Sequence, residues 1–552
     1  MKRLPISVKR LPLRTTVTLT TAVLLLNWLL IRPAQWNLNS EISTFPKARS
    51  DKSLVNESSF LYSMHAVFES SANNNESDAE LNFELALFLI RRCANRSPVK
   101  LTSNGQELSE SPKKISICKQ KFESTNSECP WPGSPHCAWG GFTLRALIST
   151  NQLTPDNYKS EIQKFVRSNF QLRIGEKLNL PLHTIPIPLS AVLDRPQRQH
   201  RLVICVQPLF LYDDWLNLIR FVELWRQLGA QHFFIYHQSI TQQVQRILSH
   251  YEARQLVTLV PWPKLPSHND VDPNQQLYRA EMFTAVNECL LRTRDSAEFV
   301  ALADLDELIV PVNGNETLLE FVEQTFTEMD NGDPQIGALL FRSQLASSIT
   351  DGLPNGAMPH QCHTLFGDLT NVQLNDFAFP PGQMSKVIVR PEMVRRVHIH
   401  QVLQFQRPTV RHRFVDRTRA AVLHFRRVQE DKGTRRFHEH STWHNSTLLS
   451  DLAERACATW HSERGADKLA ELDIIFEITE PESDSMRQKF RSLRTRWQST
   501  ASKMQRCLDY YHQQRPFECP AVAVKCEAIW TNAEATGRIE FTWADSGRWF
   551  AV

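Results

Sequence analysis

The sequence predicts an α/β fold with a mostly parallel central sheet flanked by helices, preceded by a transmembrane helix and a stalk. Two observations lead to this prediction. Between positions 201 and 302, short runs of β-branched and aromatic residues alternate with longer segments whose apolar residues recur at helical spacing. Near the N-terminus, residues 15–31 form an uncharged apolar run. Strands that alternate with helices form βαβ units, which assemble into parallel sheets.

The individual elements follow from these patterns and from the residues that end them. Gly229, for example, comes directly after a helical pattern and is typical of a helix C-terminus. We expect strands at 201–210, 232–236, 256–260 and 299–303, further strands at 337–341, 386–389, 397–400 and 421–424, and helices at 213–228, 244–251, 275–292 and within 448–511. Because ligands of open α/β sheets bind at the carboxyl ends of strands, the site should lie where the strand at 299–303 ends.

The apolar run at 15–31 has the length and the flanks of a membrane anchor. Arg14 and Arg32 close it on either side, and five basic residues precede it, which places the body of the protein in the lumen. A cleaved signal peptide is the alternative, but the run is longer than the usual apolar region of about 7 to 15 residues. We therefore expect a single-pass type II membrane protein.

Glycosylation sequons and cysteines also indicate a lumenal body. Five Asn-x-Ser/Thr sequons and eleven cysteines occur in the chain, and cysteines in an oxidising compartment usually pair. Zinc is the competing interpretation, but no C-x-x-C pair is present. We expect a cytoplasmic tail at 1–14, the anchor at 15–31, a stalk at 32–78, a small disulfide-linked region at 79–195, the main domain at 196–440 and a helical C-terminal extension at 441–552.

Charge and size exclude some classes of protein. With 552 residues, of which 41% are hydrophobic, the chain can bury at least one full-sized core. Its net charge of +4 is small beside 63 basic and 59 acidic residues, so nothing indicates a surface for nucleic acid.

Asp304 and Asp306 are the leading candidates for chemistry. A carboxylate that ends an apolar strand is costly unless something binds it, whereas the similar pair Asp270 and Asp272 sits in a polar loop. Two aspartates at this spacing suit a hard divalent cation, which neutralises the charge of a departing diphosphate. His398, His400 and His424 are candidates for a third metal ligand.

Several blocks of the chain, in this order, resemble the glycosyltransferase family 92 proteins. They are ICVQPLF, DDWLNLIRFVELWRQLGAQHFFIYHQS, LVTLVPWPKLP, YRAEMFTAVNECLLR, FVALADLDELIVP, KVIVRPEMV and LHFR, and they span residues 201–427. The resemblance implies a GT-A fold that binds a nucleotide sugar, dependence on Mn²⁺, and inverting transfer from UDP-galactose to a glycan acceptor on a glycoprotein or glycolipid. It also implies a Golgi membrane protein.

The resemblance also assigns roles to residues of this chain. It implies metal ligands at Asp304, Asp306 and His424, and donor contacts at Gln207, Pro208, Tyr236, Gln238, Lys386 and Arg390. An inverting transfer further needs a base near the acceptor hydroxyl. Glu392, Asp376 and Asp416 are the candidates for this base, and the sequence does not choose among them.

Two other functions remain open at this point. One is a metal-dependent phosphoryl transferase or hydrolase, although neither G-x-x-x-x-G-K-[ST] nor G-x-S-x-G occurs in the chain. The other is a non-catalytic glycan-binding protein of the secretory pathway that keeps the fold without turnover. Metal binding without transfer would identify it.

Overall fold

The computed structural model describes the greater part of the chain after residue 58. The described residues are 59–68, 83–95, 99–103, 116–126, 128–149, 170–174, 183–184, 198–267, 272–314, 316–330, 335–348, 366, 369, 372–425, 446–464, 506–507, 509–511, 517–527, 541–544 and 550–551. The predicted tail and the predicted anchor at 15–31 lie outside this set. Among the helices that are described, none has the length and apolar character needed to cross a membrane.

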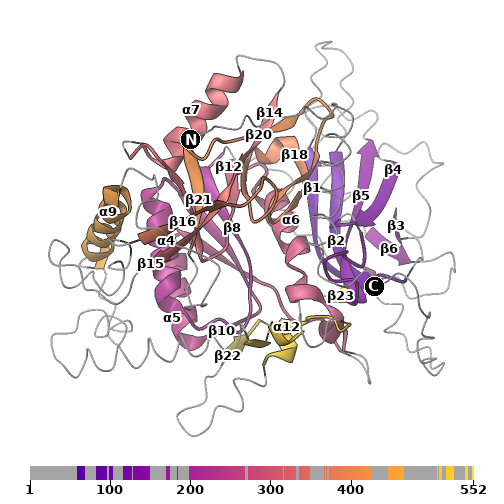
Figure 1. Ribbon diagram of the computed structural model, residues 1–552. Coiled ribbons are helices and arrows are strands. Elements are labelled where there is room, and N and C mark those ends of the chain that lie inside the picture. Colours follow the sequence, from indigo (N-terminus) through magenta and orange to yellow (C-terminus); the bar gives the residue numbers. More distant parts are fainter. Residues whose placement is uncertain are drawn as a thin grey trace, which may run out of the picture. The chain divides into compact units, whose positions relative to one another are not determined.

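A seven-stranded sheet forms the centre of the main domain (Figure 1). Its strands, in spatial order, are β11 (Val257–Pro261), β9 (His232–His237), β8 (His200–Leu209), β12 (Ala297–Leu302), β17 (Lys386–Val389), β14 (Ile336–Phe341) and β20 (Arg411–Phe414). Strand β17 runs antiparallel to both of its neighbours, and the other neighbouring strands pair in parallel. The prediction of a mixed α/β fold with a mostly parallel sheet is confirmed.

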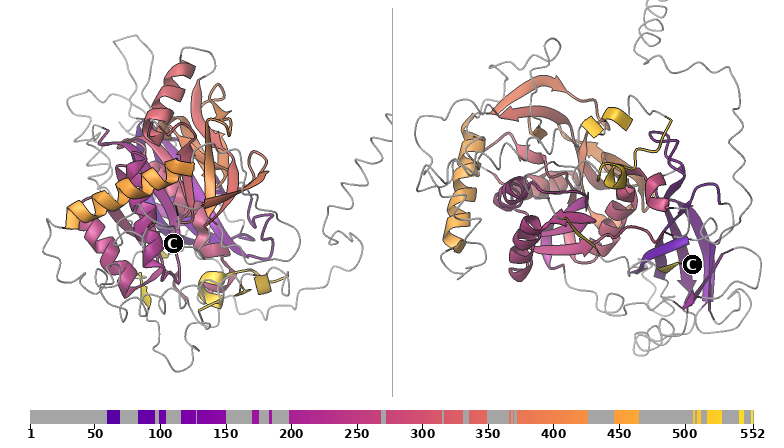
Figure 2. Two further views of the ribbon diagram at one scale, coloured as in Figure 1. Left: turned by 60° about the vertical axis from the view of Figure 1, so that its left-hand side comes forward. Right: turned by 90° about the horizontal axis from the view of Figure 1, so that it is seen from below.

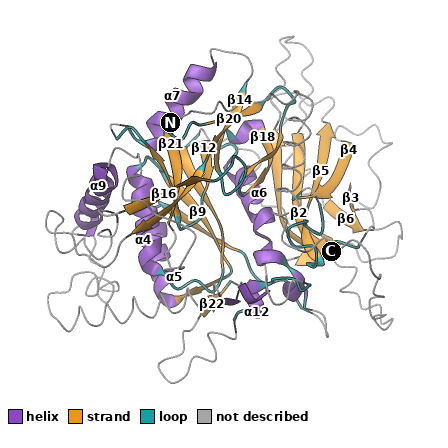
Figure 3. Ribbon diagram, viewed as in Figure 1, coloured by secondary structure: helices purple, strands orange, loops and turns teal. Residues whose placement is uncertain are grey.

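Helices cover both faces of this sheet, as Figure 3 shows. In β8, Leu202 and Ile204 belong to the core cluster that also contains the apolar residues of α4 (Trp215–Gln227) and α5 (Gln242–Ala253), whereas Val203 and Cys205 belong to the cluster on the other face. This alternation follows from the two-residue period of a strand. The first cluster also includes residues of α7 (Leu318–Asp330) and α9 (Ser446–Arg464), and the second includes residues of α6 (Met282–Thr293).

Helix α4 shows how local sequence defines an element beside the site. Asp214 caps its N-terminus by accepting a hydrogen bond from the backbone N–H of Asn217 at 3.1 Å. Residues Leu218, Val222 and Trp225 recur at helical spacing and are buried. Gly229 follows with a φ of +100°, a conformation that glycine adopts without strain.

Helix α6 begins later than the sequence predicts. Residues 275–281 instead belong to two short 3-10 turns, Pro273–Gln276 and Tyr278–Glu281. Arg279, Ala280 and Glu281 all have positive φ angles, between 41° and 56°, and such angles cannot continue a right-handed helix. The predicted helix at 275–292 was therefore wrong in its first two turns, because apolar spacing carries no information about backbone handedness.

A second sheet of four strands leads away from the end of β12. Its strands, in spatial order, are β13 (Glu307–Pro311), β21 (Ala420–Phe425), β15 (Ser343–Ser348) and β16 (Val372–Ala378). Strands β13 and β21 are antiparallel, with Glu307 opposite His424 and Pro311 opposite Ala420. A short 3-10 turn at Pro391–Met393 is followed by the hairpin of β18 (Val394–His398) and β19 (Gln401–Phe405). This arrangement brings the chain downstream of β17 back toward the end of β12.

A five-stranded antiparallel sheet is built from four strands that precede the main domain in the chain and one strand near the C-terminus. In spatial order its strands are β23 (Phe550–Ala551), β1 (Ser59–Phe68), β2 (Phe83–Arg92), β5 (Trp139–Ser149) and β4 (Ser116–Ser124). The predicted stalk at 32–78 therefore includes a strand, and Phe60 and Leu61 within it are buried. Three further short strands pair with one another, β3 (Val99–Ser103), β6 (Phe170–Ile174) and β7 (His183–Thr184).

Side chains join this N-terminal sheet to the main domain. His65 lies 2.8 Å from the Glu288 carboxylate of α6, and the Tyr62 hydroxyl donates a hydrogen bond to the Pro261 carbonyl at 2.6 Å. Glu84 accepts hydrogen bonds from Arg145 of its own sheet and from Arg395 of β18. The N-terminal sheet therefore packs as part of the main body.

Disulfides and short strands fasten the C-terminal segment. Cys137 bonds to Cys519, and Cys507 bonds to Cys526 beside α12 (Val522–Lys525). Strand β22 (Phe541–Trp543) pairs with β10 (Ser239–Thr241), which follows β9 (Figure 2). The extension at 441–552 thus begins with helix α9, as predicted, but also supplies strands. Two more disulfides join Cys93 to Cys129 and Cys205 to Cys289.

Candidate active site

The acidic residues Asp304 and Asp306 lie in the turn between the two sheets. Strand β12 ends at Leu302, the backbone N–H of Glu307 donates to the carbonyl of Asp304 at 3.1 Å, and β13 then begins at Glu307. The side chain of Asp306 is 42% exposed, whereas that of Glu307 is only 1% exposed. We call Asp304, Asp306 and Glu307 the acidic turn. It lies at the carboxyl end of the central sheet, where the sequence predicted the site.

Lys386 enters the acidic turn from β17. Because β17 is antiparallel to β12, its first residue lies near the carboxyl end of β12. The Lys386 ammonium lies 2.8 Å from Asp304 Oδ2 and 2.7 Å from Glu307 Oε2, and its side chain is 1% exposed. Burial alone would lower the pKa of Lys386, but the charges of Asp304 and Glu307 raise it above its ordinary value. Lys386 therefore stays cationic and neutralises part of the acidic charge.

His424, which belongs to β21, contacts the acidic turn. Its Nε2 atom lies 3.2 Å from Asp306 Oδ2, and its Nδ1 atom lies 3.6 Å from Glu307 Oε1. The antiparallel register that sets Glu307 opposite His424 fixes this position, and the backbone N–H of Phe425 donates to the Asp306 carbonyl at 2.8 Å. Burial raises the pKa of Glu307 despite the opposing charge of Lys386.

Helix α4 supports the backbone of the acidic turn. The Asn217 side chain donates a hydrogen bond to the Leu305 carbonyl at 3.1 Å, and the indole N–H of Trp225 donates to the Glu307 carbonyl at 3.2 Å. These bonds satisfy the carbonyls of Leu305 and Glu307. The position of the carboxylates is thereby tied to a helix packed in the core.

The other two candidate histidines have different surroundings. His398 stacks on Phe283, with ring centroids 4.9 Å apart, and His400 Nδ1 lies 3.1 Å from the Ser385 carbonyl. Burial lowers the pKa of each to about 4, so both rings are neutral at physiological pH. Of the three candidates, His424 is the one that contacts Asp306.

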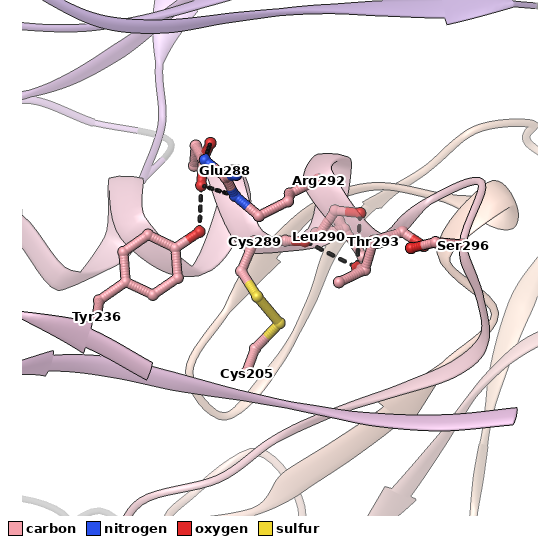
Figure 4. Close-up of a disulfide and its surroundings, with 8 residues drawn as sticks. All are labelled: Cys205, Tyr236, Glu288, Cys289, Leu290, Arg292, Thr293 and Ser296. Carbon is pink, nitrogen blue, oxygen red and sulfur yellow. Dashed lines mark hydrogen bonds and ion pairs between the residues drawn. A yellow bond between two sulfur atoms is a disulfide. The ribbon is translucent and has the colours of Figure 1, made fainter. Parts of the chain in front are cut away.

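The predicted donor residues of β8 and β9 divide into two groups. Gln207, Pro208 and Gln238 lie at the carboxyl ends of these strands, where Gln238 N–H donates to the Leu209 carbonyl at 2.7 Å. The Oε1 atoms of Gln207 and Gln238 are buried and have no hydrogen-bond partner within the described part of the chain. Tyr236 instead points onto α6, where its hydroxyl donates to Glu288 (Figure 4). Tyr236 is therefore committed to the core beside the Cys205–Cys289 disulfide.

The remaining predicted site residues either lie away from the acidic turn or have side chains outside the described part of the structure. Val389 pairs with Val300, so Arg390 and Glu392 lie toward the opposite end of β12. There the Arg390 guanidinium covers the Phe326 ring at 4.4 Å, and Glu392 pairs with Arg198 at 3.0 Å.

Of the other two base candidates, Asp416 lies away from the acidic turn. Asp416 is exposed and accepts a hydrogen bond from Thr418 at 2.8 Å, four residues before Ala420, which lies opposite Pro311 at the far end of β13. Asp376 belongs to β16, and its side chain lies outside the described residues.

The structure also brings a segment to the site that the sequence did not single out. Tyr212 is held by the backbone of Ser239 at 3.2 Å and Thr241 at 3.0 Å. Burial raises the pKa of Tyr212, and the nearby carboxylates of Asp214, Asp213 and Asp306 raise it further. Asp213 and Asp214, which follow β8 in the chain, were the sequence signal that could have revealed this segment. They mark the carboxyl end of β8, the strand that pairs with β12.

The acidic turn fits a divalent cation that shares its coordination with a ligand. Asp306 and His424 offer an oxygen and a nitrogen 3.2 Å apart, which are donor types that Mn²⁺ accepts. The Lys386 ammonium donates a hydrogen bond to Oδ2 of Asp304, so a cation would bind Asp304 through Oδ1. No group of three or more acidic, histidine or cysteine ligands is assembled among the described residues. Cations at phosphate sites usually take one or two carboxylates together with water and phosphate oxygens.

Comparison with known proteins agrees with the resemblance. The family model described as "Glycosyltransferase family 92" matches residues 200–457. One family 92 protein of Caenorhabditis elegans is 35% identical over 140 residues, which cover 25% of this chain and 27% of the relative. Another from the same organism is 27% identical over 210 residues, 36% of each chain. The chain thus spans about a quarter to a third of the length of these relatives.

Solved structures show only remote similarity. A mannosyltransferase from Pyrobaculum calidifontis in complex with GDP-Man and Mn²⁺ is 12% identical, with a TM-score of 0.22, over 68% of this chain and 95% of its own. S. aureus TarS in complex with UDP is 11% identical, with a TM-score of 0.22, over 63% of this chain and 97% of its own. The similarity therefore rests on the sequence comparisons: residues 200–457 of this chain match the glycosyltransferase family 92 model.

Proposed function

We propose that this protein is a metal-dependent, inverting glycosyltransferase with a GT-A fold, which transfers galactose from UDP-galactose to a glycan acceptor. The match of residues 200–457 to the family 92 model supports glycosyl transfer. The choice of galactose, the inverting course and the dependence on Mn²⁺ come from the resemblance of the sequence blocks to that family. The acceptor is proposed by class only.

The observation that carries this proposal is the pairing of Asp306 with His424 at the carboxyl end of the central sheet. Their donor atoms lie 3.2 Å apart, beside the buried Lys386 and Glu307. We propose Asp306 and His424 as the protein ligands of the cation, with Asp304 adjacent through its second oxygen. When bound, a divalent cation would stabilise the negative charge that develops on the departing nucleoside diphosphate.

Lys386 has a different role from the one the sequence suggested. Its ammonium is buried and already bonded to Asp304 and Glu307, so we assign it to the acidic turn rather than to direct contact with the diphosphate. Lys386 reduces the repulsion between the neighbouring carboxyl groups of Asp304 and Glu307. It thereby holds the cation-binding residues in place before the donor arrives.

The donor nucleotide would bind at the neighbouring strand ends. Gln207 and Gln238 each keep one buried amide oxygen without a partner among the described residues, and a buried acceptor without a donor is costly. An N–H donor such as the imide of uracil would satisfy one of them. Tyr236 and Arg390 are not included in this proposal, because their side chains are engaged elsewhere.

The catalytic base is not assigned. Glu392 and Asp416 lie toward strand ends distant from the acidic turn, so neither is proposed. Asp376 remains a prediction from the sequence. For the cellular setting we propose a Golgi membrane protein with residues 15–31 as its anchor and its catalytic body in the lumen, because sequons and disulfides belong to that compartment.

A donor screen tests the proposed function. The full chain, purified in detergent, would be incubated with a panel of UDP- and GDP-sugars and Mn²⁺, and nucleotide release would be followed with and without EDTA. Selective, EDTA-sensitive release of UDP from UDP-galactose is the expected result. Bound Mn²⁺ without turnover of any donor would instead favour the non-catalytic glycan-binding protein. Metal-dependent hydrolysis of phosphate esters would favour the phosphoryl transferase or hydrolase.

A further inference from the structure

The C-terminal strand β22 lies against the segment that carries Gln238. Strand β22 pairs with β10 in antiparallel register, with Trp543 opposite Ser239 (Figure 1). Directly after this strand, the backbone N–H of Ala544 donates a hydrogen bond to the Gln238 carbonyl at 2.9 Å. We call residues 541–544 the C-terminal strap. The strap therefore contacts the end of β9 through its backbone.

The backbone of Gln238 is held from two sides. Its N–H donates to the carbonyl of Leu209, the last residue of β8, at 2.7 Å, and its carbonyl accepts from Ala544 of the strap. Gln238 is 3% exposed, and its side-chain Oε1 has no hydrogen-bond partner within the described part of the chain. Since buried polar groups are generally hydrogen-bonded, an acceptor held in this state indicates a place for a donor from a ligand.

Side-chain contacts also fasten the strap to the body of the protein. The Lys264 ammonium lies 3.4 Å from the centroid of the Trp543 ring and 3.1 Å from the Glu527 carboxylate. The same tryptophan packs against the cluster that contains the buried residues Leu211 and Val522. The position of the strap is thus fixed by packing as well as by its pairing with β10.

Gln238 and the acidic turn lie at the same edge of the central sheet. Strands β9, β8 and β12 are parallel neighbours, so their carboxyl ends point the same way. Gln238 follows β9, the acidic turn follows β12, and β8 lies between them. Two strand spacings separate them across the sheet, which is about 10 Å. A ligand lying across the end of β8 could therefore contact both.

We propose that the C-terminal strap is part of the donor site, where it positions Gln238 for the base of the nucleotide. Ala544 is the positioning residue: its N–H holds the Gln238 carbonyl, and it does not itself touch the donor. This inference rests on the proposed function, in which the buried oxygen of Gln238 accepts a hydrogen bond from the base. It extends the donor site to a segment outside residues 200–457, the region that matches the family model.

Replacing Ala544 with Pro tests the proposal, because proline has no backbone N–H to donate. The full chain, purified in detergent with Mn²⁺ present, would be titrated by calorimetry with two probes, UDP and inorganic diphosphate. The loss of one positioning hydrogen bond should raise the Kd for UDP about 3- to 10-fold. The Kd for diphosphate, which has no base, should stay unchanged. A general structural defect would weaken the binding of both probes.

A double variant tests whether the strap acts through Gln238. Gln238→Ala alone should also weaken the binding of UDP, and adding Ala544→Pro to it should have little further effect, because the two groups act as one unit. Phe517→Ala is the control within the C-terminal segment. Phe517 is 81% exposed and its ring contacts that of His136, so this substitution should change the affinity for neither probe.

The outcomes separate this inference from the proposed function. A folded Ala544→Pro variant that binds UDP as wild type does would overturn the role of the strap and leave the proposed function intact. Fully additive losses in the double variant would show that the strap does not act through Gln238. Wild type that binds no UDP would contradict the proposed donor and the inference with it.

A second variant keeps the test decisive if Ala544→Pro does not fold. Trp543→Ala removes the ring that contacts Lys264 and so loosens the strap without changing the backbone. It should produce the same selective loss of UDP binding, measured against diphosphate in the same way. Unchanged UDP binding in this variant would contradict the proposal.

Discussion

The Lys386 ammonium lies 2.8 Å from the Asp304 carboxylate, although the two residues are 82 positions apart in the chain. The antiparallel insertion of β17 between β12 and β14 creates this contact. It gives the acidic turn an internal countercharge, so the aspartates can lie together at the end of a buried strand. The exposed member, Asp306, is left beside His424.

Replacing Asp306 with Asn should remove catalysis while preserving the fold. The carboxylate is partly exposed and its loss leaves no buried charge unpaired. Since a bound cation contributes several kcal/mol to such a transition state, transfer should fall about 100-fold or more. Release of UDP from UDP-galactose measures the effect, with the melting temperature as control. Transfer near the wild-type rate would show that Asp306 does not bind the cation.

Replacing Lys386 with Met should destabilise the protein. The substitution leaves Glu307 buried and without its countercharge, and such losses cost about 3–5 kcal/mol. Urea denaturation would measure the free energy of unfolding. Lys121→Met is the matched control, because Lys121 is exposed and its pair with Glu123 should contribute less than about 1 kcal/mol. Equal effects of the two substitutions would contradict the role assigned to Lys386.

Glu281 should make stability depend on pH. Burial raises its pKa from 4.5 to about 7, against the hydrogen bond from Thr284. The folded protein therefore binds this proton more tightly than the unfolded chain does. The stability that Glu281 contributes is complete below pH 4.5 and is lost as the pH rises to about 7.

The variant Glu281→Gln isolates this effect because Gln does not titrate. Between pH 4.5 and 7.5, wild type should lose about 3 kcal/mol of unfolding free energy relative to the variant, at 1.36 kcal/mol for each pKa unit. Urea denaturation at several pH values measures the difference. A difference that stays constant with pH would show that Glu281 has an ordinary pKa.

The N-terminal sheet should be required for the main domain to fold. Phe60, Tyr62 and Trp139 share a core cluster with Trp262 and other residues of the main domain. A fragment of residues 196–552 would expose that surface and leave Cys519 without Cys137. We expect this fragment to aggregate on expression, whereas residues 54–552 remain soluble. A monomeric, cooperatively melting 196–552 fragment would contradict this dependence.

The sequence was most informative where structure is determined locally. Strands β8, β9 and β11 and helices α4 and α5 lie where apolar periodicity predicted them, within a few residues. Each of these elements is defined by its own residues: the apolar face, the cap at Asp214 and the terminating Gly229. The acidic turn at the end of β12 followed in the same way, from an apolar strand that stops at two aspartates.

Non-local pairing explains what the sequence could not supply. The contact of His424 with Asp306 depends on the register of β13 with β21, and the position of Lys386 depends on the direction of β17. Neither direction nor register is visible in a strand pattern taken alone. Strand β1 was assigned to a stalk because the residues around it are polar, although its burial comes from β2, about 20 residues later.

The most direct test of this account is a crystal structure with UDP and Mn²⁺, with the metal located by anomalous scattering. We expect one peak within about 2.3 Å of an Asp306 carboxylate oxygen and of His424 Nε2, with Lys386 still bonded to Asp304. A peak distant from both Asp306 and His424, or UDP bound without any metal at the acidic turn, would contradict the account.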